Sequence, residues 1–149
     1  SEKEIQARYE IYLEQYQMKI QIESRIIADI ARNHIIPTAI NYQNKLIENV
    51  RGLKELMDAK TYKKLSKEQI NMITEISERI SKIISDVNEM TNQRRKANKI
   101  SDVEKIAKAY CNRVLPYFEN IRYQTDKLEL LINDEDWPLP KFRELLFTK

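Results

Sequence analysis

Turn-forming residues are scarce in this sequence of 149 residues, which contains one glycine and four prolines. All-β folds and Rossmann-like folds need many tight turns, so this composition argues against both classes. What the sequence does contain is 33% charged and 42% hydrophobic residues. The composition therefore predicts an all-α protein made of long helices.

Histidine and cysteine occur once each, as His34 and Cys111. Zinc sites and di-iron bundles need several such ligands, and a serine nucleophile needs a general base, so we expect none of these sites. A single glycine also excludes a glycine-rich phosphate loop. One cysteine excludes an internal disulfide and suits a reducing cytoplasm. Because Cys111 lies beside the apolar positions of a predicted helix, we expect a buried, unreactive thiol.

His34 lies three residues before Pro37, inside a long helical pattern. It could accept a phosphoryl group, as histidines of helical phosphotransfer modules do. Those histidines are followed by an acidic residue, whereas Ile35 and Ile36 follow here. The favoured interpretation is a structural histidine on the helix surface or partly buried.

Long apolar runs are absent as well. None approaches the ~20 residues that a membrane-spanning helix needs, and no signal peptide is visible. The net charge of +3 is mild and gives only weak evidence for nucleic-acid binding. We therefore expect neither a membrane nor a nucleic-acid partner. The sequence begins with Ser1 and not with Met, which suggests a piece of a larger protein.

Apolar residues recur every three or four positions along three stretches, which predicts three long helices. The first covers about residues 3–57 and should kink near Pro37, because proline lacks an N–H and clashes with the carbonyl four residues earlier. After a polar link, the second covers about 67–99 and the third about 102–132. Ser66 and Ser101 begin predicted capping boxes for these two helices. Short connections predict an antiparallel bundle, which forms a single domain over residues 1–149.

The first predicted helix is much longer than its companions, at ~80 Å against ~50 Å for a rise of 1.5 Å per residue. Residues from about 3 to 23 should therefore project beyond the bundle while carrying an apolar row. Such a row is not expected to face water in a soluble monomer, so it predicts contact with another copy or with a missing part of a parent protein. The predicted contact residues are Ile5, Tyr9, Tyr12, Tyr16 and Ile20.

The last segment is different in character. Asp134 to Pro140 should be extended, because each of its prolines disfavours the α conformation in the residue before it. A short helical segment with an apolar face should follow. Two interpretations stay open for Trp137, Phe142 and Phe147: the tail folds back to seal the end of the bundle, or it docks on another subunit.

Basic residues should gather at the tip where the second and third helices meet. Nucleic-acid binding is one interpretation, but no aromatic residue that could stack on bases and no recognition motif lies nearby in the sequence. A solvated tip, or salt bridges to a neighbouring subunit, is favoured. The residues are Arg94, Arg95, Lys96, Lys99, Lys105, Lys108 and Arg113.

Most of the chain, from about Ile5 to Thr148, resembles the C-terminal helical region of type III glutamine synthetases, the long bacterial form of that enzyme. The resemblance is carried by the segments DIARNHIIPTAINYQNKLIENVRGLKEL, RRKANK, AYCNRVLPYF and YFENIRYQTDKLELLINDEDWPLPKFRELLF. It is most specific at Asn33-His34, at Pro37-Thr38-Ala39, at Tyr42-Gln43 and at Trp137-Pro138-Leu139-Pro140.

The resemblance implies that the parent protein is a ligase of nitrogen metabolism, which joins ammonia to glutamate with ATP and a divalent metal, Mg or Mn. Its catalytic domain would lie upstream, so no catalytic, cofactor-binding or metal-binding residue is assigned here, and the fragment alone should be inactive. The implied role is a non-catalytic accessory or oligomerisation domain of a cytoplasmic, ring-forming homo-oligomer. Its partners would be the rest of the parent chain and other copies. The alternative is a free-standing, coiled-coil-like scaffold or adaptor that dimerises through the first helix.

Overall fold

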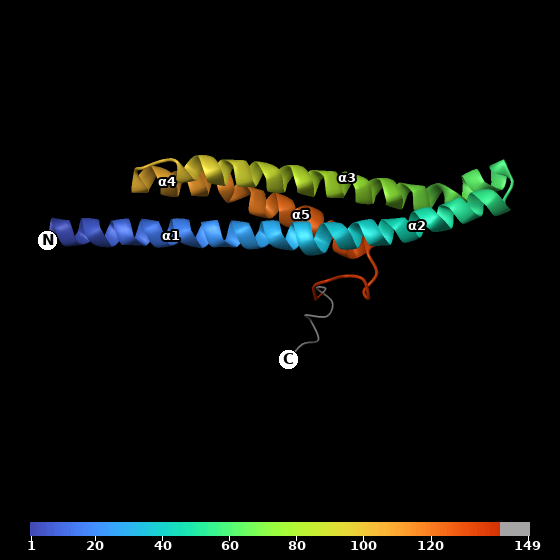
Figure 1. Ribbon diagram of the computed structural model, residues 1–149, viewed down its shortest axis with the longest axis horizontal. Coiled ribbons are helices and arrows are strands. Elements are labelled where there is room, and N and C mark those ends of the chain that lie inside the picture. The colour runs from blue at the N-terminus through green and yellow to red at the C-terminus, as the bar shows by residue number, and fades with distance from the viewer. Residues whose placement is uncertain (141–149) are drawn as a thin grey trace. The chain divides into compact units, whose positions relative to one another are not determined.

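The computed structural model describes residues 1–140, which form helices and their connections, with no strand among them (Figure 1). This confirms the all-α prediction, and the three predicted helical stretches are present. Phe142, Phe147 and the predicted C-terminal helical segment lie outside the described residues. In chain order the elements are α1 (Glu2–Ile30), the π-helical segment η1 (Ala31–Ile35), α2 (Ile36–Leu56), α3 (Ala59–Asn98), α4 (Val103–Ala109), the π-helical segment η2 (Tyr110–Val114) and α5 (Pro116–Leu131).

The chain divides into two compact units. Unit 1 consists of Ser1–Ala31 together with Ile83–Arg122, and unit 2 consists of Arg32–Lys82 together with the residues from Tyr123 onward. Each unit has its own buried side chains and is described by itself. The single domain, the antiparallel arrangement of the whole bundle and the kink near Pro37 stay predictions. No helix among the described residues is long and apolar enough to cross a membrane.

Each proline within a helical stretch follows a π-helical segment. Pro37 lies two residues after the end of η1, and Pro116 lies two residues after the end of η2. At η2 the amide of Leu115 donates to the carbonyl of Tyr110 at 2.9 Å, which is one residue further back than in an α-helix. The wider turn accommodates a proline, which has no N–H and would clash with the carbonyl four residues earlier.

The prediction that Ser66 caps the second helix is wrong. Helix α3 begins at Ala59, and Ser66 lies buried inside it, where its hydroxyl donates to the carbonyl of Tyr62 at 2.6 Å. The seven residues from Ala59 to Leu65 include no glycine or proline, so nothing in the sequence stops the helix from starting earlier. The predicted polar link therefore shrinks to Met57 and Asp58.

The third stretch also begins with a different cap from the one predicted. Asp102, not Ser101, is the N-cap of α4, and its carboxylate accepts a hydrogen bond from the amide of Lys105 at 3.0 Å. Asp102 has extended backbone angles, as an N-cap requires. The aspartate satisfies a free amide of the first turn and also places negative charge at the positive end of the helix dipole.

Unit 1 is held together by a row of buried side chains from all of its helices. On α3 they follow the predicted helical spacing, and on α1 the small Ser24 and Ala28 allow neighbouring helices to approach closely. Tyr110 of η2 is fully buried, and its hydroxyl donates to the side-chain oxygen of Asn98, the last residue of α3. The buried residues of this unit are Ile20, Ser24, Ala28, Ala31, Ile83, Asp86, Val87, Met90, Thr91, Ala97, Ala107, Ala109, Tyr110, Val114 and Ile121.

In unit 2, hydrogen bonds between side chains join α2 to the first half of α3. Gln43 donates to the Ile73 carbonyl at 2.8 Å and to the Ser77 hydroxyl at 2.6 Å, while Asn49 donates to Gln69 at 2.5 Å. The partner number falls as the α2 residue number rises, so these two segments run in opposite directions. The buried core of unit 2 includes Ile35, Ala39, Val50, Ile76, Ile80, Leu128 and Ile132.

Trp137 belongs to the buried part of unit 2, where its side chain is 7% exposed. An ion pair of 2.7 Å between Lys45 of α2 and Asp136 connects the segment around the tryptophan to α2. The amide of Asp136 also donates to the side chain of Asn133 at 3.0 Å. The tryptophan side chain is therefore covered by this unit and is not presented to solvent.

Candidate interaction surface

The beginning of α1 is helical although it buries almost nothing. Ser1 forms a capping box with Glu4: its hydroxyl accepts from the Glu4 amide at 3.3 Å, and the Glu4 carboxylate reaches back to the N-terminal nitrogen. Glu2 and Glu4 also place negative charge at the positive end of the helix dipole. These local interactions stabilise the first turn of α1.

Large apolar side chains lie exposed on this first part of α1. Ile5 is 70% exposed, Tyr12 is 63% exposed and Tyr9 is 45% exposed, whereas Tyr16 is half-buried. Ile20 is only 3% exposed and belongs to the core of unit 1, so it is not available to a partner. Five residues of this helix were predicted to contact a partner. Ile5, Tyr9 and Tyr12 are exposed, Tyr16 is partly exposed, and Ile20 is buried.

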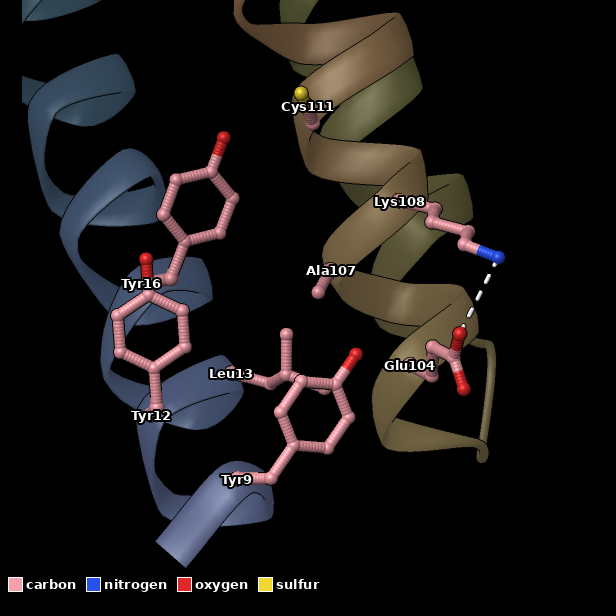
Figure 2. A pocket seen from close by; sticks show the side chains of 8 residues that line it. All are labelled: Tyr9, Tyr12, Leu13, Tyr16, Glu104, Ala107, Lys108 and Cys111. Atoms are coloured by element: carbon pink, nitrogen blue, oxygen red, sulfur yellow. Dashed lines mark ion pairs between the residues drawn. The ribbon is translucent and has the colours of Figure 1, made fainter.

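Below these side chains, α1 faces α4 and η2 across a groove of about 320 Å³ (Figure 2). Tyr9, Leu13 and Tyr16 point from α1 into the space between the helices, and Ala107 points toward them from α4. The lining residues are Tyr9, Tyr12, Leu13, Tyr16, Glu104, Ala107, Lys108 and Cys111. We call this feature the tyrosine groove.

The tyrosine groove corrects the prediction that residues 3–23 project freely. Helix α3 begins at Ala59 and has 40 residues, so it is longer than the predicted second helix of about residues 67–99. Tyr9, Tyr12, Leu13 and Tyr16 of α1 line the groove together with α4 and η2, whereas no residue before Tyr9 lines it.

Cys111 is exposed, so the prediction of a buried thiol is wrong. It lies one turn after Ala107, on the row of residues that faces α1, and not on the row of Tyr110 and Val114 that enters the core. Hydrogen bonding with the Cys111 side chain raises the pKa of Tyr16, and partial burial and the charges of Cys111 and Tyr12 raise it further. The two side chains therefore meet at one end of the groove.

The rim of the tyrosine groove on α4 carries both signs of charge. Lys108 and Glu104 form an ion pair at 3.3 Å, drawn in Figure 2, and both side chains are more than half exposed. Exposed pairs of this kind add at most about 1 kcal/mol to stability, because water and salt screen them. The pair leaves the groove with an apolar floor and a nearly neutral edge.

His34 lies on η1 in unit 2, and its side chain is exposed. The residues of η1 that pack are Ala31 and Ile35, which are 2% and 1% exposed. Among the described residues, no group of three or more histidine, cysteine, aspartate or glutamate side chains is placed to hold a metal ion. Ala31 and Ile35 are therefore the residues of η1 that pack in the interior, whereas the side chain of His34 faces solvent.

A second exposed apolar row on α1 was not predicted. Met18 follows Tyr9 by nine residues, or about two and a half turns at 3.6 residues per turn, so it lies on the opposite side of the helix. The row consists of Ile11, Met18, Ile22 and Ile26, each 51–59% exposed. Its spacing of seven, four and four residues was the available signal.

Comparison with known proteins agrees with the resemblance found in the sequence. Residues 1–54 match the family model described as the glutamine synthetase C-terminal domain. The whole chain is 48% identical over 149 residues to a glutamine synthetase of Bacteroides fragilis, of which it covers 20%. It is 23% identical to a type-3 glutamine synthetase of Dictyostelium discoideum and 27% identical to a glutamine synthetase of Butyrivibrio fibrisolvens, over 98% and 99% of the chain. The chain spans about a fifth of the length of these relatives.

Proposed function

We propose that this chain, which belongs to the glutamine synthetase C-terminal domain family, is a non-catalytic helical domain that supports the assembly of a longer glutamine synthetase. The parent enzyme would join ammonia to glutamate with hydrolysis of ATP, using Mg or Mn. We place ATP, the metal and the reacting groups in the rest of the parent protein. The chain by itself would form no glutamine.

The observation that carries this proposal is the exposed apolar surface at the beginning of α1. Ile5, Tyr9 and Tyr12 are 45–70% exposed on a segment that begins with its own capping box and is helical without much packing. Tyrosine is enriched in the buried centres of protein interfaces, because its rigid ring covers a large area at a low entropic cost. We infer that this surface is covered in the parent protein, by another part of its chain or by another copy.

Three further features belong to the same proposal. The three helical stretches would pack as an antiparallel bundle, as the hydrogen bonds between α2 and α3 in unit 2 support. The first stretch would bend at Pro37, where η1 already departs from α-helical geometry. The parent would be a ring-forming homo-oligomer of the cytoplasm, with neither a membrane nor a nucleic acid as its partner.

The test uses the parent glutamine synthetase with Ile5→Asp and Tyr12→Asp, which place charge at two positions whose side chains are exposed. We expect sedimentation velocity to show smaller particles than the unmodified enzyme, and glutamine formation to fall with the loss of assembly. A matched control is Leu130→Asp in unit 2, which replaces another exposed apolar side chain, 79% exposed, by an acid.

Equal sedimentation of the double variant and the unmodified enzyme would remove the assembly role. A loss of helicity in the 149-residue chain carrying the same two changes would show instead that the surface is part of its own core. Glutamine formation by the unmodified 149-residue chain would refute the non-catalytic assignment. A tight dimer of that chain, abolished by the double variant, would favour the free-standing scaffold instead.

A further inference from the structure

A second, polar pocket of about 560 Å³ lies in unit 1, where the end of α3 meets η2 and the start of α5. Its polar lining is Gln93 and Lys96 of α3, Asn112 and Arg113 of η2, and Tyr117 and Asn120 of α5. We call it the cationic pocket. Its volume lies within the range of about 300–1,000 Å³ that is usual for small-molecule sites.

The described residues that line the cationic pocket include two cations and no carboxylate. Lys96 and Arg113 are both exposed, and neither forms an ion pair with any described residue. This distinguishes them from Lys108, which Glu104 neutralises at 3.3 Å on the rim of the tyrosine groove. The pocket therefore presents two positive charges that are free to meet an anion.

The lining of the cationic pocket also includes uncharged polar side chains. The side-chain amides of Asn112 and Asn120 can each donate two hydrogen bonds. The side-chain amide of Gln93 donates to the carboxylate of Glu89, one turn earlier on α3, at 2.8 Å. This carboxylate therefore already has a hydrogen-bond partner. A planar guanidinium, an ammonium and two amides around one space suit a phosphoryl group, whose oxygens accept several hydrogen bonds at once.

The pocket is larger than a phosphate ion, and it contains an aromatic ring. Tyr117 is half-buried and belongs to the lining of the pocket. The sequence suggested no stacking aromatic near the basic tip, but the first turn of α5 brings Tyr117 beside two of the tip residues. Tyrosine rings stack on flat heterocycles, to which every base offers a face.

The local backbone also supports a binding role. Asn112 and Arg113 belong to η2, a π-helical turn, and such turns are rare and occur frequently at functional sites. Tyr110 and Val114 hold this turn in the core, both 0% exposed, while the residues between them face outward. Because the buried residues on either side hold this turn, the backbone of Asn112 and Arg113 has a fixed position at the pocket.

We propose that the cationic pocket binds a phosphorylated small molecule with a flat ring, with the phosphate between Lys96 and Arg113 and the ring on Tyr117. This site is separate from the assembly role proposed above, and it can hold or fail independently. A solvated basic tip and a non-specific attraction for polyanions are the competing explanations.

The test is a titration of the 15N-labelled 149-residue chain with AMP, inorganic phosphate and adenosine, each at the same ionic strength. We expect saturable shifts of the backbone amides of Asn112, Arg113 and Asn120 with AMP. Inorganic phosphate and adenosine should each bind at least tenfold more weakly. Lys96→Gln and Arg113→Gln should each raise the Kd for AMP at least tenfold, and Tyr117→Leu should raise it for AMP but not for phosphate.

The matched control is Lys105→Gln, which removes one exposed positive charge from unit 1 outside the lining of the pocket. It should change the Kd for AMP less than twofold. Absence of saturable shifts with AMP would overturn the site, and so would a loss of affinity in the control equal to that in Lys96→Gln. Phosphate binding as tight as AMP binding would refute the assigned ligand class. Circular dichroism of each variant checks that the chain is still helical.

Discussion

Tyr110 gives the sharpest test of how unit 1 is held together, because a buried ring and one hydrogen bond can be removed separately. The side chain is 0% exposed, and its hydroxyl donates to the side-chain oxygen of Asn98. Tyr110→Phe keeps the ring and removes only the hydrogen bond, which is worth about 0.5–1.5 kcal/mol net. Asn98 is itself exposed and can bond to water instead, so we expect the lower half of that range.

Tyr110→Ala removes the ring as well and leaves a cavity. Aromatic-to-alanine changes at buried positions cost about 3–5 kcal/mol, a large part of the ~5–15 kcal/mol that stabilises a typical domain. Urea unfolding followed by circular dichroism measures both variants. Tyr123→Phe is the matched control: that tyrosine is 55% exposed, so the change should cost less than about 0.5 kcal/mol.

The pH dependence of stability offers a second readout of the same residue. Burial raises the pKa of Tyr110, against smaller lowering effects from Arg94, Arg25 and the hydrogen bond with Asn98. A raised pKa in the folded state means that the neutral form is favoured there. The stabilisation is therefore complete below the ordinary tyrosine pKa of about 10 and is lost as the pH rises through the raised value.

Tyr110→Phe should accordingly lose less stability than the unmodified chain between neutral pH and alkaline pH above 10. The raised pKa of Tyr16 leaves a residual slope in both proteins. If Tyr110→Phe costs as much as Tyr110→Ala, or if Tyr123→Phe costs as much as Tyr110→Phe, the description of a buried, hydrogen-bonded ring is wrong.

Two further predictions test places where the structure differs from the sequence-based expectations. Asp102→Ala should lower the free energy of unfolding in urea by about 0.5–2 kcal/mol, because it removes the N-cap of α4. Ser101→Ala should be nearly neutral. A larger loss for Ser101→Ala than for Asp102→Ala would show that Ser101 is the cap after all. Cys111 should react with a thiol reagent in the folded chain nearly as fast as in the denatured chain, because it is exposed. Protection of that thiol in the folded chain would contradict its position at the open end of the tyrosine groove.

Periodicity was enough to predict the cores of the helices. The sequence predicts one row along the second helix, and six of its eight members are buried while Ile73 and Arg94 are half-buried. The row is Ile73, Ile76, Ile80, Ile83, Val87, Met90, Arg94 and Ala97. A row of this kind is set by 3.6 residues per turn alone, so it needs no knowledge of what lies opposite. The same reasoning predicted the end of the first helical stretch to within one residue of Leu56.

Helix starts and exposed side chains were predicted less well, for a physical reason. Ser66 fits a capping box by sequence, but a cap forms only where the backbone leaves the helix, and residues 59–65 favour continuing it. Cys111 follows a core residue directly, and only the position of α1 shows that its row faces the tyrosine groove. Both errors come from reading one segment without its neighbours.

The two π-helical segments share a pattern that bears on His34. ARNHIIP and YCNRVLP each begin with a buried residue, continue with three exposed ones, bury the fifth and end in proline at the seventh. Asparagine is third and a basic residue is fourth in both, so His34 on η1 corresponds to Arg113 on η2. A proline at the seventh position favours a wide turn before it, and that turn presents the fourth residue to solvent. The histidine is thus held outward by the same backbone device that places Arg113 in the cationic pocket, and its exposure needs no chemical role of its own.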